Sequence, residues 1–151
     1  MTDNVVPIKN YVLAAIAAVG AFAGEALGGW DAMMKLLVAL MGMDILTGCL
    51  VAAVWKRSNK SESGALNSRS GFKGLCRKCM ILLMVWLGVL LDNAIGSTYI
   101  RNMVVIFFVG NEGLSLLENL GLMGVPYPDF LKKALEVLHD QGNKGEVSRN
   151  E

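Results

Sequence analysis

Charged residues are scarce in this 151-residue sequence, where Asp, Glu, Lys and Arg together make up 18%. Soluble domains contain about 25% charged and about 45–50% apolar residues, whereas this chain is 54% hydrophobic. Most of its Lys and Arg falls in two stretches, 56–78 and 132–149. Charge that is separated from long apolar runs in this way indicates a membrane protein. The net charge of +1, with no basic face that also carries aromatic residues, argues against nucleic-acid binding.

Histidine and cysteine are too few for the common catalytic and metal sites. His139 is the single histidine; it lies among charged residues, and no nucleophile or second histidine accompanies it to form a catalytic or metal site. Cys76 and Cys79 have a spacing found in zinc and redox sites, but no second ligand pair completes a set. We therefore expect a protein that is not an enzyme and that binds no metal or cofactor. The N-terminus also lacks a signal-peptide pattern, so the first apolar stretch is expected to remain in the mature protein.

Four apolar stretches are long enough to cross a bilayer, and they cover residues 11–29, 33–55, 79–96 and 102–122. Only residues 97–101 separate the last two, which requires an antiparallel pair. The sequence predicts an all-α integral membrane protein with about four transmembrane helices in antiparallel hairpins, over residues 1–125. A three-span alternative remains, in which the Gly- and Ala-rich first stretch does not cross.

A basic linker at residues 56–78 predicts the orientation in the membrane. It is rich in Ser, Asn and Gly, and we interpret it as a solvated loop. Basic residues near spans stay on the cytoplasmic side, so with four spans both termini are also expected to be cytoplasmic. The residues that carry this prediction are Lys56, Arg57, Lys60, Arg69, Lys73, Arg77 and Lys78.

The C-terminal part, residues 126–151, is expected to be a short amphipathic helix and a polar tail. Pro126 and Pro128 stop the preceding helix, and Asp129 can cap a new one. The apolar side chains of this new helix share one face, but its charge is too high for a span. It is therefore expected on the membrane surface or against a partner, with a disordered tail from Gly142 onward.

Glycines spaced four apart mark the first apolar stretch, at Gly20, Gly24 and Gly28. This spacing puts them on one helix face, where the absence of side chains allows close contact with another helix. Self-association between copies and packing within one chain both explain such a face, and the sequence does not choose between them.

A polar stripe follows the fourth span. Its members occupy an arc of roughly 120° on a helix that is otherwise apolar. An acid at the centre of a span costs about 2.5–3.5 kcal/mol in lipid, so the stripe must face protein or water. We favour a functional role for this stripe, which consists of Asn111, Glu112, Ser115, Glu118 and Asn119.

Further polar residues lie in the second and third spans. Asp44 lies near the middle of the second, with Thr47 and Gly48 one turn later, and Asp92 lies near the outer end of the third. They could line an opening formed when copies assemble, or they could make hydrogen bonds between helices. For Asp92 we favour the second alternative, with Arg101 as its counter-charge.

Several of these residues belong to motifs that resemble the phage lysis and toxin-secretion holin family of Gram-positive bacteria and their phages. The resemblance covers roughly residues 40 to 140, and the motifs occur in a characteristic order and spacing. They are Asp44-Ile45-Leu46-Thr47-Gly48, Gly71-Phe72-Lys73-Gly74, Leu90-Leu91-Asp92, the stretch from Asn111 to Asn119, Gly124-Val125-Pro126-Tyr127-Pro128 and Leu131-Lys132-Lys133-Ala134-Leu135.

The resemblance implies a protein that assembles with itself in the lipid bilayer and opens a lesion at a set time. The lesion would release an endolysin or export a large toxin, and an antiholin is a further candidate partner. Under this hypothesis the polar residues of the second, third and fourth spans serve assembly or line the opening. A small ion channel or transporter, and a membrane scaffold without permeability, are the competing interpretations.

Overall fold

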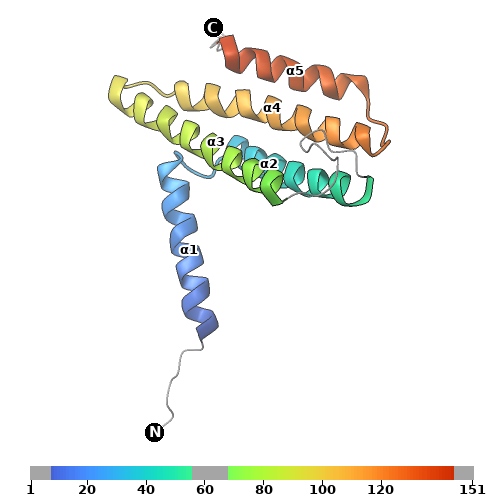
Figure 1. Cartoon of the computed structure of the whole chain (residues 1–151). Coiled ribbons are helices and arrows are strands. Elements are labelled where there is room, and N and C mark those ends of the chain that lie inside the picture. The colour runs from blue at the N-terminus through green and yellow to red at the C-terminus, as the bar shows by residue number, and fades with distance from the viewer. Residues whose placement is uncertain (1–7, 56–67, 145–151) are drawn as a thin grey trace.

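The computed structural model describes residues 8–55 and 68–144, and every described element is helical (Figure 1). In chain order the elements are α1 (Ile8–Ala26), α2 (Ala32–Leu50), the π-helical turn η1 (Val51–Trp55) that continues α2, α3 (Ser68–Ile95), α4 (Ile100–Leu122) and α5 (Asp129–Lys144). Four helices, α1, α2 with η1, α3 and α4, are long and apolar enough to cross a membrane. The predicted all-α membrane fold with a further C-terminal helix is confirmed.

The third helix is longer than the sequence predicted, because it begins at Ser68 instead of near Cys79. The prediction of a loop is therefore wrong for residues 68–78, which form the first turns of α3. Lys, Arg and Leu in this segment are good helix formers, and they outweigh its glycines and serines. Arg69, Lys73 and Arg77 are exposed on the helix and Lys78 is buried, while Lys56, Arg57 and Lys60 lie outside the described residues.

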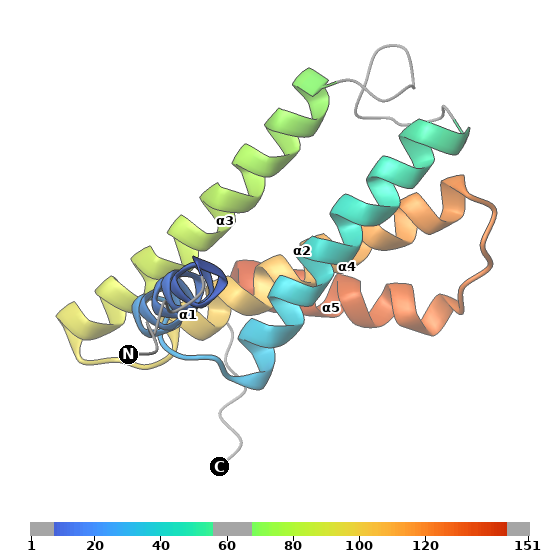
Figure 2. The same ribbon diagram turned by 90° about the horizontal axis from the view of Figure 1, so that it is seen from below.

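The centre of the bundle is α4, with α2 and α3 on one side of it and α5 on another (Figures 1 and 2). Apolar side chains at helical spacing fill the space between α2, α3 and α4, as expected for amphipathic packing. This core consists of Leu27, Met34, Leu37, Leu40, Met41, Ile81, Val85, Val105 and Val109. Because α4 packs against three helices, it has less surface for lipid than the others.

A close approach joins α3 to α4. The predicted antiparallel pair is present, and its turn contains Gly96 with a φ of 68°. On α3, eight residues before Gly96, a Cβ placed on Gly88 would lie only 2.9 Å from Cα of Arg101. The backbones therefore meet at a point where a side chain would have to push them apart.

The first helix projects away from the bundle (Figure 1). Gly24 is its single buried residue, and its large apolar side chains are exposed. The Trp30 indole fills the notch at Gly24, where a Cβ would lie 2.1 Å from Nε1, and this Nε1–H donates to the Gly20 carbonyl at 3.4 Å. Gly28 lies beyond the end of α1 with a φ of 80°. The prediction of one face with three glycines is thus wrong at Gly28, because the helix ends two residues earlier.

The amphipathic C-terminal helix lies along α4 of the same chain. Glycines bring the two backbones together, because a Cβ on Gly110 would lie 2.5 Å from the backbone nitrogen of His139, and one on Gly142 2.4 Å from Cβ of Phe107. These pairs run in opposite directions along the chain, so the helices are antiparallel. The polar tail predicted from Gly142 begins later than expected, since α5 continues to Lys144.

Two glycine-to-alanine substitutions in α3 should have opposite effects on stability. Gly88→Ala should lower the melting temperature in detergent, because its methyl group would meet the Arg101 backbone. Gly74→Ala, with no atom within 4 Å of the added Cβ, should be neutral or stabilising by up to about 1 kcal/mol, because alanine is the better helix former. Equal melting temperatures for the two variants would contradict the close approach.

Candidate functional site

A buried ionic cluster occupies the middle of the bundle, where α2, α3 and α4 meet. The ammonium group of Lys78 on α3 donates to Asp44 Oδ2 of α2 at 2.7 Å, and it also pairs with Glu112 Oε2 of α4. The side chains of these residues are only 8%, 6% and 2% exposed. One lysine thus bridges two acids from two different helices at a depth that side chains shield from the surroundings.

Neutral side chains add further hydrogen bonds to Asp44. Its Oδ1 accepts from the Ser115 hydroxyl at 2.7 Å and from the Asn119 amide at 3.0 Å. The same amide donates to the Thr47 hydroxyl at 3.0 Å, and Thr47 donates in turn to the Met43 carbonyl at 2.8 Å. We call Asp44, Thr47, Lys78, Glu112, Ser115 and Asn119 the midspan cluster.

The midspan cluster holds α2, α3 and α4 together by buried ion pairs, and breaking one of these pairs has a high free-energy cost. Removing one partner of a buried ion pair typically costs about 3–5 kcal/mol, because the other charge stays buried without compensation. The three helices are therefore tied to one another through Lys78.

The structure divides the predicted lining residues into those it brings together and those it does not. Glu112, Ser115 and Asn119 point into the midspan cluster, and Gly48 lies beside it, where a Cβ would be 3.7 Å from the Asn119 amide nitrogen. Asn111 is half-buried and Glu118 is exposed, because they lie about 100° or more from Glu112 around the helix. Of the five residues of the predicted stripe, only Glu112, Ser115 and Asn119 therefore contact the midspan cluster.

Lys78 was predicted as a loop residue, and this prediction is wrong. The buried residues of α3 are Lys78, Ile81, Val85, Gly88 and Asp92, which are spaced three and four apart. The same spacing, continued backward from Ile81, would have placed Lys78 on the buried face of the helix. The sequence analysis grouped Lys78 with its basic neighbours Arg77 and Lys73. All three residues are on α3, but only Lys78 lies on the buried face of the helix.

A second polar cluster lies at one end of the bundle, where the chain turns from α1 to α2. The Arg101 guanidinium donates to the Leu27 carbonyl at 2.9 Å and to the Gly29 carbonyl at 3.1 Å, and it pairs with Asp31. Positive φ values at Gly28 and Gly29 shape the turn that presents these carbonyls. Arg101 therefore fixes the first turn of α4 to the end of α1, where a cation is favoured by the helix dipole.

Asp31 also begins α2, because its side chain accepts a hydrogen bond from the Met34 backbone at 2.8 Å. Burial acts to raise the pKa of Asp31, but the hydrogen bonds from Arg101 and Met34 outweigh it and lower the pKa below its usual value. Asp31 is thus the ionic partner of Arg101, a role that the sequence analysis did not assign to it.

Asp92 contacts Arg101 through the backbone and not through the guanidinium. Its carboxylate accepts from the Ile100 and Arg101 N–H groups at 3.0 and 2.9 Å and from the Ser97 hydroxyl. Tyr99, the N-cap residue of α4, makes no capping bond with its own side chain. Asp92 supplies that cap from the end of α3, so the predicted counter-charge pair is wrong while the predicted structural role of hydrogen bonding between helices fits the geometry.

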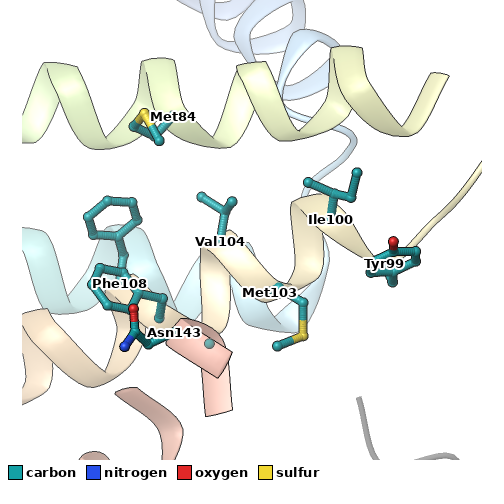
Figure 3. A pocket seen from close by; sticks show the side chains of 9 residues that line it. Met84, Tyr99, Ile100, Met103, Val104, Phe108 and Asn143 are labelled. Atoms are coloured by element: carbon teal, nitrogen blue, oxygen red, sulfur yellow. The ribbon is translucent and has the colours of Figure 1, made fainter. Parts of the chain in front are cut away.

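An apolar groove of about 350 Å³ lies on the other side of α4, between α3 and the end of α5 (Figure 3). It has no charged side chain among its described lining residues, which are Met84, Tyr99, Ile100, Met103, Val104, Phe107, Phe108, Gly142 and Asn143. None of the side chains of the two polar clusters lines this groove.

Comparison with known proteins identifies the group to which this arrangement belongs. The model of the bacteriophage holin family matches residues 21–140, a range that contains both clusters and all of α2, α3 and α4. The chain belongs to the bacteriophage holin family. As a holin-family protein with four helices able to cross a bilayer, it is a multi-pass membrane protein.

Relatives of this holin-family chain occur in phages and in Gram-positive bacteria. A probable holin of Bacillus phage phi105 is 33% identical over 116 residues, which cover 74% of this chain and 77% of the relative. An uncharacterised protein of Clostridium perfringens is 33% identical over 118 residues, with 77% and 82% covered. A 14.9 kDa uncharacterised protein of the same species is 32% identical over 136 residues, with 89% and 97% covered. No solved structure gives a significant match.

Loss of the central lysine should destabilise the bundle far more than loss of a lysine on the surface of the same helix. Lys78→Met should reduce the free energy of unfolding by about 3–5 kcal/mol, because it leaves Asp44 and Glu112 buried without their cation. Lys73→Met is the matched control, and it should change little because Lys73 is exposed. Unfolding in mixed detergent micelles measures both. A double variant with Glu112→Met should recover part of the loss, and no recovery would contradict the shared lysine.

The pair of Asp31 and Arg101 should contribute stability at neutral pH and lose it in acid. Because the folded protein lowers the pKa of Asp31, this contribution is present above the usual aspartate pKa and fades as the pH falls through the lowered value, below about pH 4. Asp31→Asn retains a capping side chain but no charge. Its melting temperature should therefore lie below that of the wild type at pH 7 and approach it below about pH 4. A difference that does not depend on pH would count against the ionic contribution.

Proposed function

We propose that this chain is a holin that assembles with other copies in the bacterial cytoplasmic membrane. Its assembly opens a lesion through which an endolysin leaves the cytoplasm, and lysis of the host follows at a set time. Two observations support this proposal: the family match over residues 21–140 and a midspan cluster that buries two acids and a lysine between three membrane-length helices.

The midspan cluster gives the protein two ways to satisfy the same polar groups. In one state the helices of a single chain satisfy them, as Lys78 does for Asp44 and Glu112. In the other state water satisfies them, once neighbouring copies part and create a shared opening. A sequence whose polar groups are satisfied in both states can switch between them when the number of neighbouring copies rises.

The orientation follows from the basic residues at the start of α3. Arg69, Lys73 and Arg77 are exposed there and follow the basic stretch 56–60 in the sequence, and short basic segments beside spans stay in the cytoplasm. The ends of α2 and α4 then lie on the cytoplasmic side, together with both termini before the lesion opens. Arg101 and Asp31 lie at the opposite, outer end of the bundle.

An endolysin is favoured as the cargo over a large toxin. The phage relative, a probable holin of Bacillus phage phi105, supports a lytic role. The two clostridial relatives are uncharacterised and do not favour a toxin as the cargo. An antiholin would be a further partner, which is expected to act on the assembly step.

Expression in bacteria with a cytoplasmic endolysin should give abrupt lysis after a delay, together with sudden loss of membrane potential. Lys78→Met should change this delay at least severalfold at equal protein level, because it removes the interaction that holds the closed bundle. Lys73→Met should leave the delay unchanged. A potential-sensitive dye measures the membrane potential, turbidity measures the delay before lysis, and immunoblots measure the protein level.

Three results would contradict the proposal. Slow, ion-selective leakage without release of the enzyme would indicate a channel or transporter. An intact membrane potential at high expression would indicate a scaffold. Equal delays for the wild type and a folded Lys78→Met variant would remove the midspan cluster from the mechanism.

A further inference from the structure

The docked position of α5 is the feature that the proposed function leaves unexplained. α5 lies opposite the middle of α4, since His139 meets Gly110, which is the eleventh residue of a helix that runs from Ile100 to Leu122. At about 1.5 Å per residue, Leu135 and His139 lie within a few ångströms of the midpoint of α4. Because α4 is long and apolar enough to cross the membrane, a docked α5 lies at the depth of the hydrocarbon core.

The outer face of α5 is unsuited to lipid at this depth. Leu135 and His139 face α4, and residues about half a turn away from them point outward. Lys133 and Asp140 lie on that outward face and are exposed, and a surface pair at 3.8 Å joins Lys132 to Glu136 beside them. Charged side chains inside a membrane normally face protein or a water-filled cavity.

The contact between α5 and α4 is closely packed along its length. Notches at Gly110 and Gly113 of α4 receive the His139 backbone and the Leu135 side chain, and Gly142 of α5 receives Phe107. Each of these positions would place a Cβ within 2.4–2.5 Å of an atom of the opposite helix. The contact thus depends on the absence of side chains at three places along its length.

We infer that the docked α5 lines the water-filled opening of the assembled protein. This inference rests on the proposed function and names the surface that would do the lining. In this arrangement Glu112, Ser115 and Asn119 face α2 and α3, and they reach water only once the bundle parts. The charged outer face of α5 lines the opening beside them, and docking of α5 accompanies opening because only the opening brings water to that face.

Spin labels in reconstituted vesicles test which medium surrounds α5. The full chain with Cys49, Cys76 and Cys79 replaced by alanine receives one label at Asp140→Cys, on the outer face. The matched control carries it at Leu83→Cys, an exposed apolar position of α3. In vesicles that release a trapped enzyme, the label at 140 should be severalfold more accessible to a water-soluble nickel chelate, relative to oxygen, than the label at 83.

A crosslink in the same vesicles tests whether α5 is docked at that moment. Val104 and Asn143 line one groove between α4 and α5 (Figure 3). A Val104→Cys, Asn143→Cys pair should therefore react with a short bifunctional thiol reagent. Gly110→Leu should reduce both the crosslink and the release of enzyme severalfold. Gly42→Leu, in α2 with no atom within 4 Å of the added Cβ, should change neither.

Each alternative result overturns the inference. A label at position 140 that favours oxygen would place the outer face of α5 in lipid, and release of enzyme without the crosslink would show that α5 is undocked in the open state. Wild-type vesicles that release no enzyme at any protein density would contradict the proposed function itself. Release that is unaffected by Gly110→Leu would contradict the role of α5 alone.

Discussion

The sharing of Lys78 between Asp44 and Glu112 is the interaction on which the rest of the structure depends. It fixes the register of α2, α3 and α4 at one depth, because a shift of one turn in any of them would leave a buried charge without its partner. Apolar burial is not directional, so the ion pairs add a constraint on the register that burial alone does not supply. The second cluster, around Arg101, fixes the end of the bundle at the α1–α2 turn.

The position of α4 between these partners explains why its composition differs from that of the other spans. One side meets the midspan cluster through Glu112, Ser115 and Asn119, and another meets α5 through Gly110 and Gly113. Polar residues and glycines would weaken a helix surrounded by lipid. Here Glu112, Ser115, Asn119, Gly110 and Gly113 each have a specific contact, so features that would make α4 a poor isolated span make it the centre of the bundle.

Much of the fold could be predicted from the sequence, because long apolar runs and a short turn determine helices and their pairing. The polar positions of α4 were also predictable from their spacing. The partners of these positions were not, since Lys78 and Asp31 belong to segments that look like loops until a distant helix packs against them. The pairing of Arg101 with Asp31 instead of Asp92 depends on the α1–α2 turn, and a linear sequence does not show where such a turn lies.

The exposure of α1 has a consequence for how the chain varies among its relatives. Apart from the notch at Gly24, α1 presents its side chains outward, so its residues need to be apolar but need no particular shape. The family match begins at residue 21, close to that notch. Apolar substitutions should therefore be tolerated in the first half of α1. Few positions of α4 should tolerate substitution, because α4 contacts α2, α3 and α5.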